Sequence, residues 1–324
     1  MARASSRVRS CTWRSRQWEP AVYSVSAAPV SFQTHERVEA EGYHRLRISY
    51  TSEEGDPIQA FLLLPDGNGP FGAVLVHHQH NGERHFGKSE VCGLAGDPLQ
   101  AFGPALARRG MVVLAPDSIC FEDRRRNRMG TQADEAADSN QHYNELCYRL
   151  LRGDTLMRKV ISDSSQGIAL LSAHPQVDPE RIGMLGHSYG GNTVLFHGAL
   201  DERVHFACSS GAACTYPYKI EHQVGIELAE VIPGFTINFD IPDLVACFAP
   251  RPLLIVSATQ DMYSQDVGTI VTRVQETCAA IGLAAQIAHR RYTGGHTLTQ
   301  ERFDEMIDWL TQWVHIKSGA SAPI

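Results

Sequence analysis

The sequence predicts an α/β fold in which helices cover both faces of a mostly parallel sheet. Short apolar runs recur along the chain, and each is followed by a turn and a longer amphipathic stretch, as in β-strand–α-helix units. The later runs are continuously apolar, which is typical of strands that are buried on both faces. The 324 residues are 43% hydrophobic and 20% charged, enough for one large core without disulfide bonds or metal ions.

The expected elements follow in chain order. Strands are expected at residues 46–50, 58–64, 73–77, 111–115, 181–185, 206–209, 253–257 and 285–290, the first two as a hairpin. Helices are expected at residues 98–109, 140–151, 155–173, 190–200, 267–281 and 299–313. Asp154 is expected to cap the third helix, and Pro175 follows its end. Residues 212–245 mix prolines with aromatic side chains and fit neither pattern, so we expect a small cap above the sheet.

The N-terminal part of the chain differs in composition from the rest. Residues 1–35 are expected to form an Arg- and Ser-rich, disordered extension, and residues 36–324 one domain. The arginines at positions 3, 7, 9, 14 and 16 precede the first acidic residue, Glu19. The segment lacks the apolar stretch of a secretory signal and resembles a transit peptide in composition, with a plain disordered extension as the alternative.

Charge and cysteine usage exclude several classes of protein. The net charge of −7 argues against a general nucleic-acid-binding protein, and no apolar run approaches the roughly 18 residues that span a bilayer. The eight cysteines lack the spacing of zinc or redox motifs, so free thiols in a cytoplasmic protein are expected. We therefore expect a small-molecule substrate, without a nucleic-acid or membrane partner; a homodimer stays open.

One short motif carries the strongest chemical signal. Residues 186–190, Gly-His-Ser-Tyr-Gly, match the G-x-S-x-G pattern of a nucleophile elbow, between a predicted strand and a predicted helix. Such a turn exposes the serine, and the N–H groups at the helix start face the negative charge that develops on a substrate carbonyl. Ser188 is therefore the candidate nucleophile. The alternative, a phosphate-binding turn, lacks both the G-x-G-x-x-G pattern and a Walker lysine.

A serine nucleophile needs a base, and the base needs an acid that orients it. On this architecture the chain order is serine, acid, histidine. Asp261 follows predicted strand 253–257 by four residues, with Asp266 as the second candidate acid and a helix N-cap as the alternative role of Asp261. His296 follows the last predicted strand beside two glycines, with a structural loop histidine as the alternative.

The loop after predicted strand 73–77 should complete the site. Backbone N–H groups of Tyr189 and Gln79 are the expected oxyanion donors. Histidines also gather in this loop, at positions 77, 78, 80 and 85. Because adjacent strand residues point to opposite faces and no acid or cysteine has ligand spacing, we expect neither a metal nor another cofactor.

Together these motifs resemble the dienelactone hydrolase and acetyl-xylan-esterase-like group of the α/β-hydrolases. The resemblance covers residues 40–316 and includes 186–191, the Ala-Pro-Arg-Pro-Leu-Leu-Ile run at 249–255 that leads to Asp261, and Gly-Gly-His at 294–296. Two spacers, 109–117 and 177–183, are also typical of the group. Dienelactone hydrolases use a cysteine nucleophile, so the serine at position 188 makes the esterase branch the nearer one. The resemblance implies the α/β-hydrolase fold and the triad, but not the substrate.

Further residues are expected around the substrate: His78, Phe121, Tyr216, His222 and Phe235. The last three belong to the expected cap, where plain packing is the alternative. Arginines 124–126 could meet an anionic group, or form a solvated turn.

The sequence thus predicts a serine hydrolase that cleaves a small carboxylic ester or lactone through an acyl-enzyme. The same triad could instead catalyse acyl transfer, C–C bond cleavage or peptidase-like chemistry. A non-catalytic ligand-binding protein on the same fold is the alternative from another class.

Overall fold

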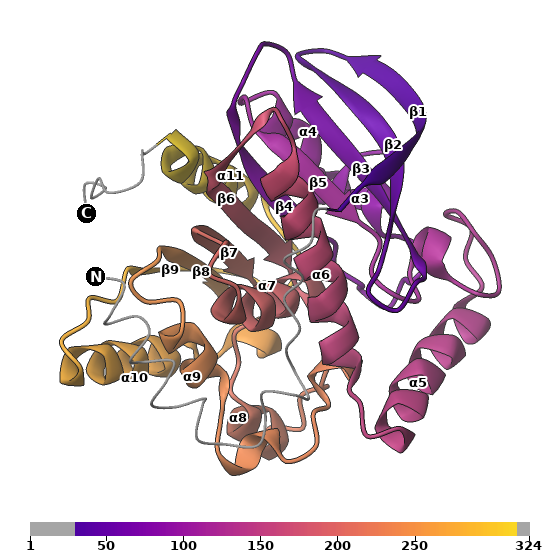
Figure 1. Ribbon diagram of the computed structural model, residues 1–324. Coiled ribbons are helices and arrows are strands. Elements are labelled where there is room, and N and C mark those ends of the chain that lie inside the picture. Colours follow the sequence, from indigo (N-terminus) through magenta and orange to yellow (C-terminus); the bar gives the residue numbers. More distant parts are fainter. Residues whose placement is uncertain (1–29, 316–324) are drawn as a thin grey trace.

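The computed structural model describes residues 30–315 and contains one nine-stranded sheet in the order β1-β2-β3-β5-β4-β6-β7-β8-β9 (Figure 1). The strands are β1 (Phe32–Ala40), β2 (Tyr43–Thr51), β3 (Pro57–Pro65), β4 (Phe71–His77), β5 (Val112–Pro116), β6 (Val177–His187), β7 (Phe206–Ser210), β8 (Leu253–Ala258) and β9 (Ile287–Tyr292). Strands β1, β2, β3 and β5 pair antiparallel, whereas all pairs from β5 to β9 are parallel. This confirms the predicted, mostly parallel sheet and the predicted hairpin, which β2 and β3 form.

Helices cover both faces of the sheet, as predicted. They are α3 (Lys88–Val91), α4 (Phe102–Ala107), α5 (Glu135–Leu151), α6 (Leu156–Ala173), α7 (Tyr189–Leu200), α8 (Tyr216–Glu221), α9 (Ile241–Ala246), α10 (Val267–Ala280) and α11 (Gln300–His315). On one face α4 and α11 pack into a core that contains Phe102, Leu106 and Leu310. On the other face α6, α7, α9 and α10 contribute to a larger core (Figure 1).

The N-terminal boundary differs from the prediction. Strand β1 begins at Phe32, so the boundary expected after residue 35 falls inside it. No sequence pattern indicates this strand, because β1 lies at the edge of the sheet and most of its side chains are polar and exposed. Residues 1–29, which hold the rest of the expected extension, lie outside the described residues.

Two helices also differ from their expected bounds. Helix α5 begins at Glu135, five residues before the expected start, because the side chain of Asp134 accepts a hydrogen bond from the N–H of Ala137. The helix expected at 98–109 is divided into a 3₁₀ turn, Pro98–Gln100, and α4.

The expected cap lies between β7 and β8. It contains α8, two 3₁₀ turns (Leu228–Glu230 and Phe235–Ile237) and α9. In Figure 1 α8 lies well beyond the ends of the strands, on the side where β6 leads into α7.

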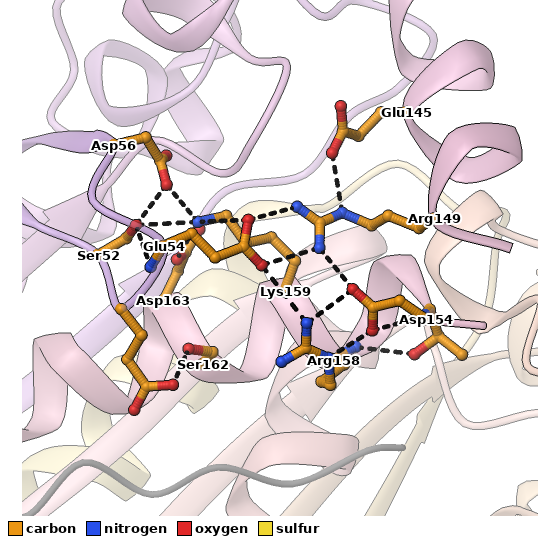
Figure 2. A network of polar contacts seen from close by, with 12 residues as sticks. Ser52, Glu54, Asp56, Glu145, Arg149, Asp154, Arg158, Lys159, Ser162 and Asp163 are labelled. Atoms are coloured by element: carbon orange, nitrogen blue, oxygen red, sulfur yellow. Dashed lines mark hydrogen bonds and ion pairs between the residues drawn. The ribbon is translucent and has the colours of Figure 1, made fainter. Parts of the chain in front are cut away.

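A polar network fastens the turn between β2 and β3 to helices α5 and α6 (Figure 2). The buried Lys159 ammonium lies 2.5 Å from the Asp56 carboxylate and 2.9 Å from the Asp163 carboxylate. Arg149 pairs with Glu54 at 2.8 Å. If the turn moved away, the buried Lys159 would be left without its partner, which is costly. The network therefore holds the hairpin turn in one position.

Two of the arginines at 124–126 belong to such structural contacts, and only Arg126 has the exposure expected of a solvated turn. Arg124 is buried and pairs with Asp163 at 2.8 Å. Arg125 is buried beside Asp138, at 2.5 Å. Arg126 is exposed and reaches Glu145. Arg124 and Arg125 therefore join segments that are distant in the chain, because their acidic partners lie on later helices.

Candidate active site

Ser188 stands on a tight turn between β6 and α7. Its backbone has φ 55° and ψ −122°, a conformation that residues other than glycine rarely adopt. The two glycines of the motif make this turn possible. A Cβ on Gly186 would lie 2.2 Å from the carbonyl carbon of Gly190, and one on Gly190 would lie 2.3 Å from the carbonyl oxygen of His77. The G-x-S-x-G spacing therefore reflects two close backbone approaches.

The structure brings Ser188, His296 and Asp261 together in one chain of hydrogen bonds. Ser188 Oγ lies 2.8 Å from His296 Nε2, and His296 Nδ1 lies 2.9 Å from Asp261 Oδ1. Burial raises the pKa of Asp261, but the interactions with His296 and the hydrogen bonds from Ser264 and Tyr263 together outweigh burial, so the net pKa is lowered. The acid is thus ionised at neutral pH, and its other oxygen accepts a hydrogen bond from the Ser264 hydroxyl at 2.7 Å.

The loops that carry the acid and the histidine are tied to each other. The N–H groups of Thr259 and Gln260 donate to the carbonyls of Tyr292 and Gly294 at 2.9 and 2.8 Å. Arg302, 2% exposed, adds a second tie, because its guanidinium donates to the carbonyls of Thr293, Gly295 and Thr297. The respective distances are 3.1, 2.8 and 3.2 Å.

The sequence patterns considered above did not identify Arg302. A signal was present: position 302 lies one turn before Met306, on the buried face of α11.

Asp266, the second candidate acid, has another role. It precedes α10, and its carboxylate accepts hydrogen bonds from the backbone N–H and the hydroxyl of Thr215. It therefore fastens the start of the cap to α10 and is not the acid that contacts His296.

The two expected oxyanion donors lie on either side of the elbow. Tyr189 is the first residue of α7. Gln79 lies in the loop after β4, and the carbonyl of His77, at the end of that strand, packs against Gly190. The Gln79 side chain is buried and donates to Glu90 at 3.1 Å, which fixes the position of this loop. Their oxyanion role remains a prediction.

A pocket of about 300 Å³ opens beside Ser188 and His296. The wall formed by the cap contains Lys219, Glu227 and Glu230, and another part of the wall contains His80 from the loop after β4. The remaining lining residues are Asn81, Gly82, Tyr189, Asn192, Gly211, Ala212, Gly225, Ile226 and Tyr263. The Tyr263 ring lies edge-on to His296, with 4.9 Å between ring centroids.

The five residues expected around the substrate are not among those that line this pocket. Phe121 is buried and stacks on Tyr189, with 5.3 Å between centroids, and His78 is buried beside it. Tyr216 and Phe235 pack on each other inside the cap, 4% and 1% exposed. His222 is exposed and stacks on Tyr218. Aromatic residues in a small cap fill its own core first, since they bury the most apolar area.

The charged groups of the pocket were not expected from the sequence. Lys219 Nζ lies 2.8 and 2.6 Å from the two carboxylate oxygens of Glu230, and both side chains are buried. Glu227 lies 2.5 Å from the imidazole of His80. Burial raises the pKa of Glu227, but the charge and hydrogen bond of His80, together with His142 and Arg84, lower that pKa to about 2. In the sequence, these residues were marked only by the presence of opposite charges within an otherwise apolar cap.

The histidines at positions 77, 78 and 80 do not share one site. His77 Nε2 contacts Ser164, His78 Nε2 accepts from the Ser118 N–H, and His80 contacts Glu227. A separate cluster of acidic residues has carboxylate oxygens that lie close enough to one another to hold a metal ion: Asp117, Glu122 and Asp123. The Lys88 ammonium lies within 2.8 Å of all three carboxylates, however, so an internal cation already occupies the place between them.

Comparison with known proteins adds a family and a set of structural neighbours. A family model for acetyl xylan esterases (AXE1) matches residues 15–234, a range that includes Ser188 but ends before Asp261. YtaP of Bacillus subtilis, a hydrolase by name, is 27% identical over 301 residues, covering 88% of this chain and 93% of that protein.

Two solved esterases illustrate the shared fold. An acetyl xylan esterase from Paenibacillus sp. R4 is 17% identical with a TM-score of 0.59, covering 88% of this chain and 90% of that one. A glucuronoyl esterase from Solibacter usitatus is 14% identical with a TM-score of 0.63, covering 90% and 89%. These likenesses confirm the predicted α/β-hydrolase fold. Within residues 30–315, no helix combines the length and the apolar character needed to cross a membrane.

Proposed function

The chain belongs to the acetyl xylan esterase family and is a carboxylic ester hydrolase, and from this premise we propose that it acts through a Ser188–His296–Asp261 triad. Ser188 Oγ attacks the ester carbonyl, and its proton moves to His296 Nε2. His296 Nδ1–H donates to Asp261, which fixes the tautomer that leaves Nε2 free to accept. The continuous chain of 2.8 and 2.9 Å contacts is the observation that supports this proposal most directly.

The remaining steps follow from the surroundings of the elbow. Backbone N–H groups of Tyr189 and Gln79 bind the oxyanion, and His296 returns its proton to the leaving alcohol. Water, deprotonated by His296, then cleaves the acyl-enzyme and regenerates Ser188. The pocket of about 300 Å³ supports a short acyl group, in agreement with the acetyl esters named for several of the structural neighbours.

Active-site labelling tests the nucleophile directly. The intact protein is treated with a fluorophosphonate and analysed by peptide mass spectrometry beside Ser188→Ala. We expect one adduct, on Ser188, and a loss of p-nitrophenyl acetate turnover of about 10⁴-fold or more in the variant. Ser188→Ala protein that is folded and retains turnover would refute the triad. A folded wild-type protein without an adduct would favour the non-catalytic, ligand-binding alternative.

A further inference from the structure

The two proposed oxyanion donors belong to different segments of the chain. Tyr189 follows β6, whereas Gln79 follows β4, the neighbouring strand in the sheet. Both backbone N–H groups must reach the same oxygen atom, so the two segments have to keep their separation to within about 0.5 Å. A residue that contacts both segments would fix this separation.

Ser118 makes such contacts. It follows β5, which lies on the opposite side of β4 from β6. Its hydroxyl lies 2.6 Å from the Tyr189 hydroxyl, and its backbone N–H donates to His78 Nε2 at 3.1 Å. His78 immediately precedes Gln79 in the loop after β4. One residue outside the elbow is thus hydrogen-bonded to a side chain of each segment.

The hydrogen bonds of His78 extend this link to the backbone of Gln79. Because His78 Nε2 accepts from Ser118, the ring proton is on Nδ1, which donates to the Gln79 carbonyl at 2.7 Å. Burial lowers the pKa of His78 to about 4, so the imidazole is neutral at neutral pH and keeps this pattern. Gln79 is therefore held at its carbonyl by His78 and at its side chain by Glu90.

An aromatic contact accompanies the polar one. The Tyr189 side chain is buried, and its ring stacks on Phe121 with an angle of 21° between the ring planes. Phe121 also contacts the His78 ring, with 4.7 Å between centroids. Phe121 and Ser118 belong to one turn, because the N–H of Phe121 donates to the Ser118 carbonyl at 3.1 Å. This turn therefore contacts both segments through two different side chains.

The backbone of the turn is strained where Phe121 is presented. Cys120 has φ 68° and Glu122 has φ 38°, values that residues other than glycine rarely adopt. The buried Glu122 carboxylate holds this conformation, because it accepts hydrogen bonds from the Lys88 ammonium at 2.5 Å and from the Ser89 N–H at 2.9 Å. Strain of this kind persists only where the surroundings enforce it, and it is typical of functional sites.

From these contacts we propose that Ser118 is a positioning residue, which sets the separation of the two segments that bind the oxyanion. Its hydroxyl holds the Tyr189 side chain, and its N–H holds the loop of Gln79 through His78. Ser118 is not a lining residue of the pocket, so it acts through these neighbours. The inference rests on the proposed function, because it assumes that both segments supply oxyanion donors.

A double-mutant cycle tests the contact between the two hydroxyls. Ser118→Ala and Tyr189→Phe each remove one hydroxyl, and both keep the backbone N–H groups and the aromatic ring at position 189. We expect either variant to lower kcat for p-nitrophenyl acetate by about tenfold, because the oxyanion contacts form in the transition states of acylation and deacylation. When both steps slow equally, KM stays within about twofold. The double variant should lose no more than either single variant, since both remove the same link.

A transition-state analogue separates positioning from a general loss of structure. The ketone 1,1,1-trifluoroacetone forms a tetrahedral oxyanion adduct with a serine nucleophile. Its inhibition constant should therefore rise in Ser118→Ala and in Tyr189→Phe by about the factor by which kcat/KM falls.

A third variant tests the link to the loop after β4. His78→Asn keeps a donor near the place of Nδ1 but is too short to accept from the Ser118 N–H, and it should also lower kcat by about tenfold. Ser172→Ala is the matched control. It removes a hydroxyl that donates to the Ile168 carbonyl at 2.8 Å, near the end of α6 that precedes β6, at the edge of the sheet opposite to Ser188. Its kcat should be unchanged.

The possible failures are distinguishable. Losses that multiply in the double variant would refute the link between the hydroxyls, and so would wild-type kcat in Tyr189→Phe. A lower kcat with an unchanged inhibition constant of the ketone would refute the positioning of the oxyanion donors. Wild-type kcat in His78→Asn would show that Ser118 does not hold both segments.

Urea denaturation shows whether each variant is folded, and if Ser118→Ala does not fold, Tyr189→Phe and the ketone decide the question. If the wild-type protein shows no Ser188-dependent turnover of p-nitrophenyl acetate, the proposed function itself fails.

Discussion

Replacing Gly190 with alanine should impair catalysis through the backbone behind the nucleophile. The added Cβ would lie 2.3 Å from the carbonyl oxygen of His77, whereas an ordinary contact is at least 3.4 Å, so one of the two segments must move by about 1 Å. The loop after β4 carries Gln79, the proposed oxyanion donor. A displacement of this size costs on the order of 100-fold in rate. Overpacking of this kind destabilises by roughly 1–3 kcal/mol.

Steady-state hydrolysis of p-nitrophenyl acetate and urea denaturation measure the two effects. Gly268→Ala is the matched control, because a Cβ on Gly268, in the first turn of α10, would meet no atom of a neighbouring segment within 4 Å. That variant should keep full activity and gain up to about 1 kcal/mol of stability. A Gly190→Ala enzyme with nearly wild-type kcat and unchanged stability would refute the close approach at the elbow.

Three further predictions concern the acid, the histidine loop and pH. Asp261→Asn should lower kcat by about 10⁴-fold, whereas Asp266→Asn should leave kcat within a few fold. Arg302→Lys should lower kcat by about tenfold at nearly constant KM, because it loosens the loop of His296; equal kcat would contradict this. Burial raises the pKa of Glu90 from 4.5 to about 7, so the folded state loses stability as pH rises through that window. Glu90→Gln should therefore be neutral at about pH 5 and stabilising by about 2–3 kcal/mol at about pH 8, in urea denaturation at both pH values.

Much of the fold could be predicted because its signals are local. Buried parallel strands are continuously apolar, and the helices between them carry one apolar face, so the order of elements can be followed along the chain. The signal of the elbow is also local, because its two glycines are required by backbone contacts close to Ser188. Asp261 and His296 followed from chain order on this fold, and the structure brings both to Ser188.

The remainder depended on contacts that are distant in sequence. Strand β1 carries few apolar residues, and only its pairing with β2 defines it. Arg124 looks like part of a solvated charged turn until Asp163, on a later helix, folds against it. In the cap, burial turned Tyr216 and Phe235 inward and left charged side chains at the pocket. No periodicity in the cap distinguishes these two groups.

The cap leaves the sheet after β7 and returns at β8 as one uninterrupted segment. Three of the charged residues of the pocket, Lys219, Glu227 and Glu230, belong to it, whereas Ser188, Asp261 and His296 follow the ends of sheet strands. The charged part of the pocket wall that the cap supplies and the proposed triad thus occupy separate stretches of the chain. Mutations that change the length or the charge of the cap can alter which esters enter the pocket. Such mutations leave the triad residues, and thus the reaction, unchanged. A lineage built on this chain can therefore diversify its substrates while it inherits a constant reaction.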